Sequence, residues 1–352
     1  MNEAGRAFKP DMVPERRPDA PNDIARGRTK SRPAGYPRMA GRSRQHVNDE
    51  HTARAAVYAQ LALGMIVFGS ATPVSKIVTE AMPVFVGATF RVALGAAVLA
   101  PFAWGQRHRL VAFSRYDWLL LCLIALFGMF GFTVFMLYGM RLVSGVAGAI
   151  VMATTPAVTA GAAILVFGER ANWRKLLAIA LAVTGVLVLQ LGGGRDGQQA
   201  SGGALVAGSL LVLAAVCCEA AYTLLGRKMS RDHDPRLIAF LAAALSVPVF
   251  LPFAVLQWPG FQPADIDPGA WVAAIWYGAG TLALGSLLWY AGIAKTQGSI
   301  AAGFMALMPV SALVLSYVLL GEEFRLMHLA GFAVVFAGVV VMSWEHGRME
   351  GN

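Results

Sequence analysis

Two charged residues, Arg91 and Glu219, lie deep inside long apolar segments of the chain. A charge at the centre of a membrane helix costs roughly 2.5–3.5 kcal/mol, so such residues usually face other helices or water. At 1.5 Å per residue, Arg91 lies about 12 Å and Glu219 about 22 Å from the outer end of its segment. We therefore expect the two charges on opposite flanks of one central cavity rather than in a direct ion pair.

Tyr222 and Thr223 follow Glu219 by three and four residues, so they share one face of a helix with it. This polar face predicts a wall that titrates a proton or recognises a cation. Two structural interpretations stay open. Glu219 is a buried hydrogen-bond partner or reaches to the nearby cytoplasmic face, and Arg91 braces the carbonyl groups of neighbouring helices.

Further polar candidates lie near the middle of apolar segments. They are Thr154, Thr155 and Ser311, which lie beside Pro156 and Pro309, and the pair Tyr277 and Thr281, one helical turn apart. A proline inside a helix frees a backbone carbonyl, which lipid tolerates only where it faces protein or water. We predict a helix break at both prolines. The sequence shows no catalytic or metal-ligand spacing, which predicts no enzymatic activity, no metal and no cofactor.

The composition indicates the solvent that surrounds these segments. Of the 352 residues, 57% are hydrophobic and 14% are charged, whereas about a quarter of the residues are charged in soluble domains. An ordinary soluble enzyme is excluded, and an all-α integral membrane protein is predicted. Runs of bilayer-spanning length predict ten transmembrane helices, at 55–73, 83–104, 118–140, 145–167, 176–191, 204–225, 237–256, 271–292, 299–320 and 327–344.

The positions of Lys and Arg predict how the spans are oriented. If residues 1–52 are cytoplasmic, 24 of the 29 Lys and Arg lie on that side of the membrane and four on the other. Basic residues concentrate in cytoplasmic loops, so we predict a multi-pass cell-membrane protein with both termini in the cytoplasm. The net charge of +9 does not indicate a nucleic-acid partner, because the basic residues flank apolar runs or lie in the tail.

Residues 1–52 contain no apolar run and are rich in Pro, Arg, Asp and Gly. Such a segment buries too little apolar surface to offset its chain entropy, so we predict a disordered basic tail. A start at Met39, with a shorter basic leader, is an open alternative. At the other end we predict a short cytoplasmic tail over 345–352.

The two halves of the chain contain an internal repeat. A shift of 153 residues aligns 144–191 with 297–344 at 12 identical positions of 48. The matches include Pro156 with Pro309, Gly168-Glu169 with Gly321-Glu322, and Gly185 with Gly338. We predict two five-helix repeats, 55–191 and 204–344, joined by a linker at 192–203. Because five is odd, the second repeat must be inverted, which is the architecture of alternating-access carriers.

Several segments resemble the drug/metabolite transporter superfamily, specifically its EamA-like families of ten spans and two repeats. They are Phe68-Gly69-Ser70, ATFRVALGA around Arg91, residues 138–170 and 290–323, and EAAYTLLGRK at 219–228. The resemblance covers about 55–344. It implies export or uptake of a small metabolite such as an amino acid, often with proton or exchange coupling. A small or aromatic residue is expected where this chain has Glu219, so any role of that carboxylate is particular to this protein.

Together these observations predict a secondary transporter that moves a small organic metabolite, an amino acid or similar, across the cytoplasmic membrane by alternating access. Export is the expected direction. The expected partners are the solute, the lipid bilayer and a proton as the coupling ion, and a homodimer is an open alternative. The rival interpretations are a membrane-embedded enzyme that acts on lipid and a non-transporting scaffold or sensor.

Overall fold

The computed structural model describes residues 40–168, 171–193, 202–296 and 303–349, and within these ranges all regular structure is helical. The chain divides into two units, Met1–Asn48 and Asp49–Asn352, and the arrangement described below is that of the second. Eight helices are long and apolar enough to cross a membrane, namely Ala55–Ala81, Val84–Trp104, Arg115–Leu142, Gly145–Val166, Gly203–Met229, Pro235–Gly260, Pro268–Ile293 and Gly303–Leu320. Leu326–Val341 is a shorter apolar helix. The predicted all-α membrane fold is confirmed.

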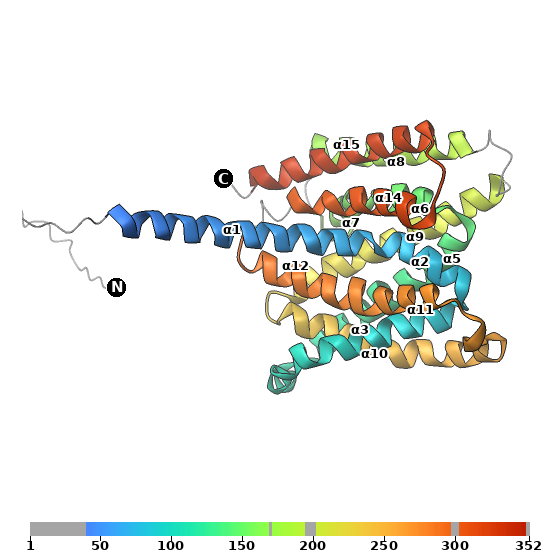
Figure 1. Ribbon diagram of the computed structural model, residues 1–352, viewed down its shortest axis with the longest axis horizontal. Helices are drawn as coiled ribbons and strands as arrows, with labels where there is room; N and C mark the ends of the chain where they lie inside the picture. Colours follow the sequence, from blue (N-terminus) through green and yellow to red (C-terminus); the bar gives the residue numbers. More distant parts are fainter. Residues whose placement is uncertain (1–39, 169–170, 194–201, 297–302, 350–352) are drawn as a thin grey trace, which may run out of the picture. The chain divides into compact units, whose positions relative to one another are not determined.

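Each repeat is a series of helices joined by short connections (Figure 1). The first contains α1 (Ala40–Gly69), α2 (Ala71–Ala81), α3 (Val84–Trp104), η1 (Arg107–Ala112), α4 (Arg115–Ile124), η2 (Ala125–Gly131), α5 (Phe132–Leu142), α6 (Gly145–Met152), α7 (Thr155–Phe167) and α8 (Trp173–Gly193). The second contains α9 (Gly202–Met229), α10 (Pro235–Gln257), η3 (Trp258–Gly260), η4 (Pro263–Asp265), α11 (Pro268–Ile275), η5 (Trp276–Leu284), α12 (Gly285–Ile293), α14 (Leu307–Leu320) and α15 (Leu326–Met349).

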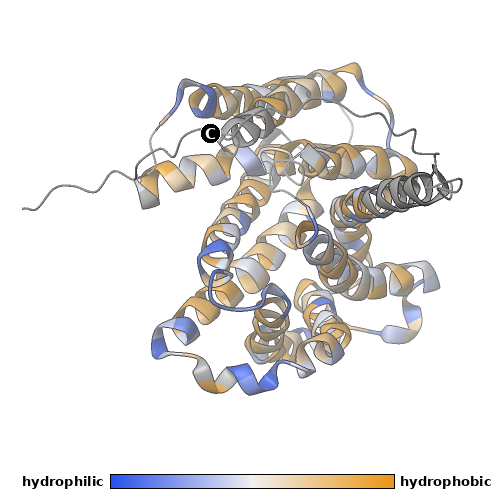
Figure 2. Ribbon diagram, turned by 90° about the vertical axis from the view of Figure 1, so that its left-hand side faces the viewer, coloured by the Kyte–Doolittle hydropathy of each residue, from blue (hydrophilic) through white to orange (hydrophobic). Residues whose placement is uncertain are grey.

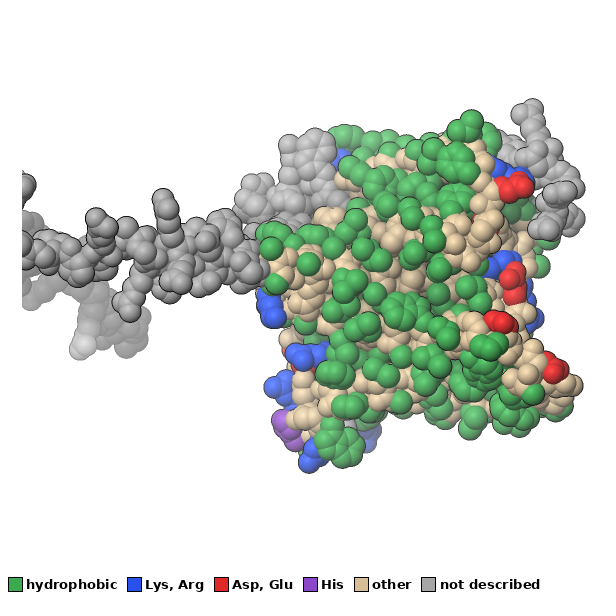
Figure 3. All heavy atoms as spheres, viewed as in Figure 1, with side chains coloured by type: hydrophobic (Ala, Val, Ile, Leu, Met, Phe, Trp, Pro, Cys, Tyr) green, Lys and Arg blue, Asp and Glu red, His purple; other side chains and the backbone are tan. Residues whose placement is uncertain are grey.

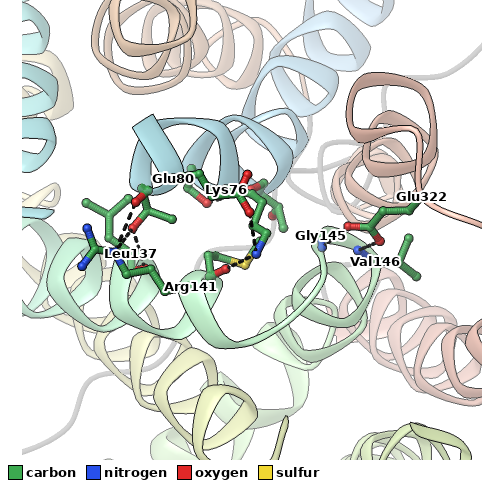
Figure 4. Close-up of polar contacts among 11 residues, drawn as sticks. Lys76, Glu80, Leu137, Arg141, Gly145, Val146 and Glu322 are labelled. Carbon is green, nitrogen blue, oxygen red and sulfur yellow. Dashed lines mark hydrogen bonds and ion pairs between the residues drawn. The ribbon is translucent and has the colours of Figure 1, made fainter. Parts of the chain in front are cut away.

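The first span is longer than the sequence predicted. We expected it to end at residue 73 and Lys76 to lie outside it, but the helix continues through α2 to Ala81. The charge of Lys76 is compatible with a helix because its Nζ lies 2.9 Å from Glu80 Oε1, one turn further on. The same Nζ also donates a hydrogen bond of 2.8 Å to the carbonyl of Met140 on α5 (Figure 4). These two partners replace the water that a loop would have provided.

The amino-terminal end of α1 differs from the predicted tail. α1 begins at Ala40, so residues 40–52, which we predicted to be disordered, are helical. Extending an existing helix adds one hydrogen bond for each residue that is fixed, which favours continuation of the first span into polar sequence. Residues 1–39 of the predicted tail lie outside the described part of the chain.

The two repeats enter the membrane from opposite sides. α2 ends the first span beside the end of α5, where Lys76 bonds to Met140. α9, the first span of the second repeat, ends beside the start of α4, where Lys228 Nζ lies 2.5 Å from the hydroxyl oxygen of Tyr116. Because α4, η2 and α5 form one span, these two contacts lie at its opposite ends. The first spans of the two repeats therefore run antiparallel, as the inverted architecture requires.

Equivalent helices of the two repeats pack against each other. α8 lies beside α15 (Figure 1), and α3 lies beside α10. A Cβ atom on Gly185 would lie 2.8 Å from the carbonyl oxygen of Gly331, and one on Gly338 would lie 3.1 Å from that of Ala178. The same shift of 153 residues relates both members of these two contacts. In lipid the hydrophobic effect does not drive helices together, so their association depends on close packing. Small residues such as these glycines allow the two backbones to come into contact.

The surface has the pattern that a bilayer requires. Hydrophobic side chains cover the visible face of the bundle, while charged side chains gather at its two opposite edges (Figure 3). Seen along the bundle, the helices are mostly apolar and the polar residues concentrate in the connections (Figure 2). The largest buried apolar cluster joins α3, α4 and α10 and includes Val92, Leu121 and Phe250.

A π-helix interrupts one span in each repeat. η2 covers Ala125–Gly131 in the third span, and η5 covers Trp276–Leu284 in the eighth. The shift of 153 residues carries 125–131 onto 278–284, inside η5. Neither segment was predicted from the sequence. Because π-helical turns are rare and frequently mark functional sites, these two segments direct attention to the residues that surround them.

Candidate solute-binding site

Arg91 lies on α3 with its side chain buried in the interior, at 7% exposure. Its guanidinium carbon lies 4.7 Å from the ring centroid of Tyr277 and 5.4 Å from that of Phe132. One terminal nitrogen, Nη1, donates a hydrogen bond to the hydroxyl of Thr133 on α5. The Nε atom is buried and has no hydrogen-bond partner in the described part of the chain. The aromatic rings thus hold the cation while part of its donor edge stays unused.

Glu219 lies on α9 and is partly buried. Its Oε2 atom lies 3.1 Å from the hydroxyl of Thr155, at the start of α7. Glu219 and Arg91 interact electrostatically, but the described residues show no N···O contact within 4.0 Å between them. The absence of a direct ion pair in this described region agrees with our expectation, and a central cavity between the two charges stays a prediction.

Tyr277 provides a second buried polar atom without a partner. It belongs to η5, its side chain is 1% exposed, and its hydroxyl makes no hydrogen bond with the described protein. Gly278, the next residue, allows the π-helix to approach α3 closely, because a Cβ there would lie 2.7 Å from the carbonyl oxygen of Arg91. An unpaired buried hydroxyl is costly, so a binding partner for it is expected.

Tyr222 is brought into the same cluster. Its hydroxyl interacts with that of Tyr290 on α12 and electrostatically with Arg91 and Glu219. The Tyr222 ring packs against Gly128 of η2, where there is no room for a Cβ atom. The π-helix in the first repeat thus makes space for an aromatic side chain from the second.

Thr223 is not part of the cluster, although we expected it on the polar face of α9. Its side chain is exposed, whereas that of Tyr222 is partly buried. The two residues diverge by about 100° around the helix axis. Tyr222 therefore contacts η2 and the cluster, while Thr223 is exposed.

The other hydroxyl candidates bond mainly to their own helices. Thr154 donates to the Val151 carbonyl at 2.7 Å, Thr281 to the Tyr277 carbonyl at 2.6 Å, and Ser311 to the Met308 carbonyl at 2.9 Å. Such bonds occupy the hydroxyl hydrogen and leave the oxygen as an acceptor. Thr155 differs because its oxygen lies near both the Met152 carbonyl, at 2.7 Å, and Glu219.

Both predicted prolines follow an irregular point in their span. The helix is interrupted at Ala153 and Thr154 before Pro156, and α14 starts at Leu307, two residues before Pro309. Each of these helices ends at a glycine with positive φ, Gly168 at 64° and Gly321 at 63°. The backbone pattern is therefore the same in both repeats.

Thr133 and Phe132, which contact Arg91, were not identified from the sequence. They lie in an unbroken apolar run, in which one threonine and one phenylalanine give no signal. Which residues Arg91 contacts depends on how α3 packs against α5, and the sequence does not show that packing. Among the described residues, no group of three or more His, Cys, Asp and Glu could hold a metal ion.

Glu322 makes an unexpected contact between the repeats. Its carboxylate accepts hydrogen bonds from the backbone N–H groups of Gly145 and Val146, the latter at 2.9 Å, at the amino terminus of α6 (Figure 4). It caps a helix of the other repeat, where a negative charge complements unpaired N–H groups and the helix dipole.

Comparison with known proteins identifies the class to which this fold and cluster belong. The model of the EamA-like transporter family matches residues 56–191 and 206–344, so the chain belongs to this family, as its resemblance to the drug/metabolite transporter superfamily predicted. A protein of known crystal structure shares the fold with a TM-score of 0.58 and 18% identity, covering 84% of this chain and 99% of that one.

Relatives with curated names are transporters. The uncharacterized transporter YetK of Bacillus subtilis is 30% identical over 81% of this chain and 86% of its own length. A probable amino-acid metabolite efflux pump of Salmonella typhimurium is 30% identical over 50% of this chain and 60% of its own. A probable terminal-alkyne amino-acid exporter of Streptantibioticus cattleyicolor is 24% identical over 61% and 70%. The family and these names support a transporter role in a multi-pass membrane protein and point away from an enzyme.

Proposed function

We propose that this protein is a secondary transporter that exports a small organic metabolite, an amino acid or a related compound, across the cytoplasmic membrane by alternating access. The solute binds at the cluster formed by Arg91, Glu219, Tyr222 and Tyr277. The two halves, 55–191 and 204–344, rock against each other about this cluster, and the linker 192–203 joins them. Both termini, including the tails 1–52 and 345–352, lie in the cytoplasm.

The observation that carries this proposal is that both repeats contribute residues to the cluster. The first repeat contributes Arg91, Thr133 and Thr155, and the second contributes Glu219 and Tyr277. In carriers built from inverted repeats, the site lies between the repeats, so that a rocking motion exposes it to each side in turn. Buried atoms without a partner, Arg91 Nε and the Tyr277 hydroxyl, are groups that a solute could satisfy.

The relatives support the choice of solute and direction. Two of them carry names that refer to amino-acid export. The excess of Lys and Arg on one side of the spans supports cytoplasmic termini. A lipid-modifying enzyme or a non-transporting scaffold would have no need for a buried polar cluster shared by both repeats.

Flux measured with purified protein in liposomes tests the proposal. Tyr277→Phe tests solute binding without disturbing the fold, because the hydroxyl bonds to no described group and its removal breaks no hydrogen bond with the described protein. We expect a rise of about 2- to 10-fold in the half-saturating solute concentration, the effect of one hydrogen bond, without a loss of thermal stability. Thr223→Val, an exposed change on α9, is the matched control and should transport normally. Absence of flux for every solute in a broad metabolite panel would contradict the proposal.

A further inference from the structure

The donor groups of Arg91 are suited to an anionic partner. Nη1 donates to Thr133, and the rings of Phe132 and Tyr277 lie near the guanidinium carbon, but Nε has no acceptor among the described residues. A carboxylate binds a guanidinium most strongly in a bidentate manner, across two neighbouring N–H groups. No acidic side chain in the described chain lies within 4.0 Å of Arg91. The missing acceptor can therefore come from the solute.

Glu219 needs a donor when it is ionised. The Thr155 hydroxyl has one hydrogen and two oxygen neighbours, the Met152 carbonyl at 2.7 Å and Glu219 Oε2 at 3.1 Å. If that hydrogen goes to the nearer carbonyl, the contact with Glu219 is a hydrogen bond only when Glu219 is protonated and donates to Thr155. An ionised Glu219 requires another donor, and an ammonium group provides both hydrogens and charge.

We infer that the solute is a zwitterionic α-amino acid whose carboxylate binds Arg91 and whose ammonium group binds Glu219 in competition with a proton. This inference rests on the proposed function, because it names the solute class and the coupling at the same cluster. With the amino acid bound, each buried charge has an opposite partner. With the site empty, the proton on Glu219 takes the place of the ammonium group.

The sign of coupling follows from this competition. Binding of the ammonium group releases the proton from Glu219, and the proton must return before the empty site crosses again. The transporter therefore exchanges one amino acid for one proton, so a proton entering the cell drives the amino acid out. A solute that carried only a carboxylate would bind best together with the proton and would be coupled in the opposite sense.

Few groups other than the solute can interfere with this exchange. The elements that pack against α9 are α4, α5, α6, α7, α8, α10 and η2. Of these, α6, α7 and η2 contain no ionisable side chain, and those of α5, Tyr138 and Arg141, lie in its last two turns. Apart from Cys122, those of α4, α8 and α10 lie in the first turn of their helices, namely Arg115, Tyr116, Asp117, Arg174, Lys175 and Arg236. Arg91 on α3 and Tyr222 on α9 are the groups that interact electrostatically with Glu219.

Competition for uptake into liposomes tests the two-point recognition. All twenty proteinogenic L-amino acids are screened, and the best one is compared with its N-acetyl derivative, which lacks the ammonium charge, and its amide, which lacks the carboxylate. We expect each derivative to compete about 10- to 100-fold less well, the effect of one charged hydrogen-bond contact. Equal competition by either derivative would overturn the corresponding contact.

A pH gradient tests the exchange. In wild-type liposomes that are acidic inside, the best amino acid should accumulate, up to about tenfold for each pH unit when one proton is exchanged. Glu219→Gln should abolish this accumulation and raise the half-saturating concentration about tenfold or more, because the amide resembles the protonated carboxyl group. Glu219→Asp should retain part of the pH dependence. The exposed Glu323→Gln is the matched control. Full gradient dependence in Glu219→Gln would overturn the inference.

The failure of this inference can be told apart from the failure of the proposed function. If the protein moves a sugar, a nucleoside or a simple monocarboxylate but none of the amino acids, the inference falls and the transporter function stands. If no solute of any of these classes moves, both fall. If an amino acid moves together with the proton rather than against it, the exchange is wrong.

Discussion

The two repeats share their backbone irregularities but not their chemistry. Both contain a π-helix in the third span of the unit, a helix start just before a proline, and a glycine of positive φ. The prolines and the glycines are related by the shift of 153 residues, under which the π-helices also overlap. The polar groups differ. The shift places Arg91 against Ala244, Glu219 against Ile66 and Thr155 against Met308. The two halves thus share a backbone scaffold, whereas each contributes different residues to the candidate site.

The strongest test of this division is Arg91→Gln, which removes the cation that only the first repeat provides. We expect transport to fall by about 100-fold or more, because loss of a buried charged contact costs several kcal/mol. Arg91→Lys should be intermediate, since it keeps the charge but loses the bidentate edge and the stacking on Tyr277. Uptake by liposomes, with thermal unfolding in detergent as a check of folding, gives the comparison. Normal transport by Arg91→Gln would show that Arg91 only braces the helices.

Gly128→Ala tests whether the π-helix of the first repeat exists to admit Tyr222. The added Cβ atom would overlap the Tyr222 ring, and overpacking of this kind costs about 1–3 kcal/mol. We expect a lower midpoint of thermal unfolding and weaker transport. Gly105→Ala, at a position with open space around the Cβ atom, is the control. Equal stability of the two variants would show that the π-helix is not needed to make room for Tyr222.

Gly168→Ala and Gly321→Ala test the equivalence of the two scaffolds. Both glycines have positive φ and open space around them, so only the backbone conformation is strained, at about 1–2 kcal/mol each. We expect equal decreases in the free energy of unfolding. Gly226→Ala, inside α9 with free space around it, should instead stabilise the protein by about 0.5–1 kcal/mol. Unequal losses at 168 and 321 would indicate that the two helix ends differ in function.

The smallest effect is expected for Thr155→Val, which makes the first repeat resemble the second at this position. The variant loses the contact that Thr155 makes with protonated Glu219, so the proton should compete less well and the half-saturating concentration of the solute should fall about 2- to 10-fold. Thr154→Val removes a hydroxyl whose hydrogen bond goes to the Val151 carbonyl, and it should change the half-saturating concentration of the solute less than about twofold. If the two variants behave alike, Thr155 has no special relation to the site.

Much of the fold was accessible from the sequence because lipid imposes simple rules. Apolar length, the distribution of Lys and Arg, and the shift of 153 residues depend only on residue type and order. The end of the first span was wrong because Lys76 finds partners in Glu80 and on α5, which apolar length does not reveal. The π-helices escaped prediction for a related reason, since a single extra residue in a turn leaves hydropathy unchanged.

The candidate site was accessible only in part. Arg91 and Glu219 were identifiable because charges are rare in apolar spans, and the structure brings both into one cluster. Thr223 is exposed rather than buried with Tyr222, because helical spacing defines a broad face and not the direction of the interior. Thr133 gave no signal, because its importance depends on which helix packs against α3. The sequence thus identifies the charged residues inside the spans, whereas the residues that surround them depend on helix packing.

The Glu322 carboxylate that binds the first turn of α6 also has a consequence for biosynthesis. The two bonded residues, Gly145 and Glu322, are 177 positions apart, so α6 is made long before its cap exists. Ser144 already accepts a hydrogen bond from the Ala147 N–H, but until Glu322 is made the N–H groups of Gly145 and Val146 must rely on water or lipid headgroups. The nascent first half is therefore left with a helix end that only the second half can complete.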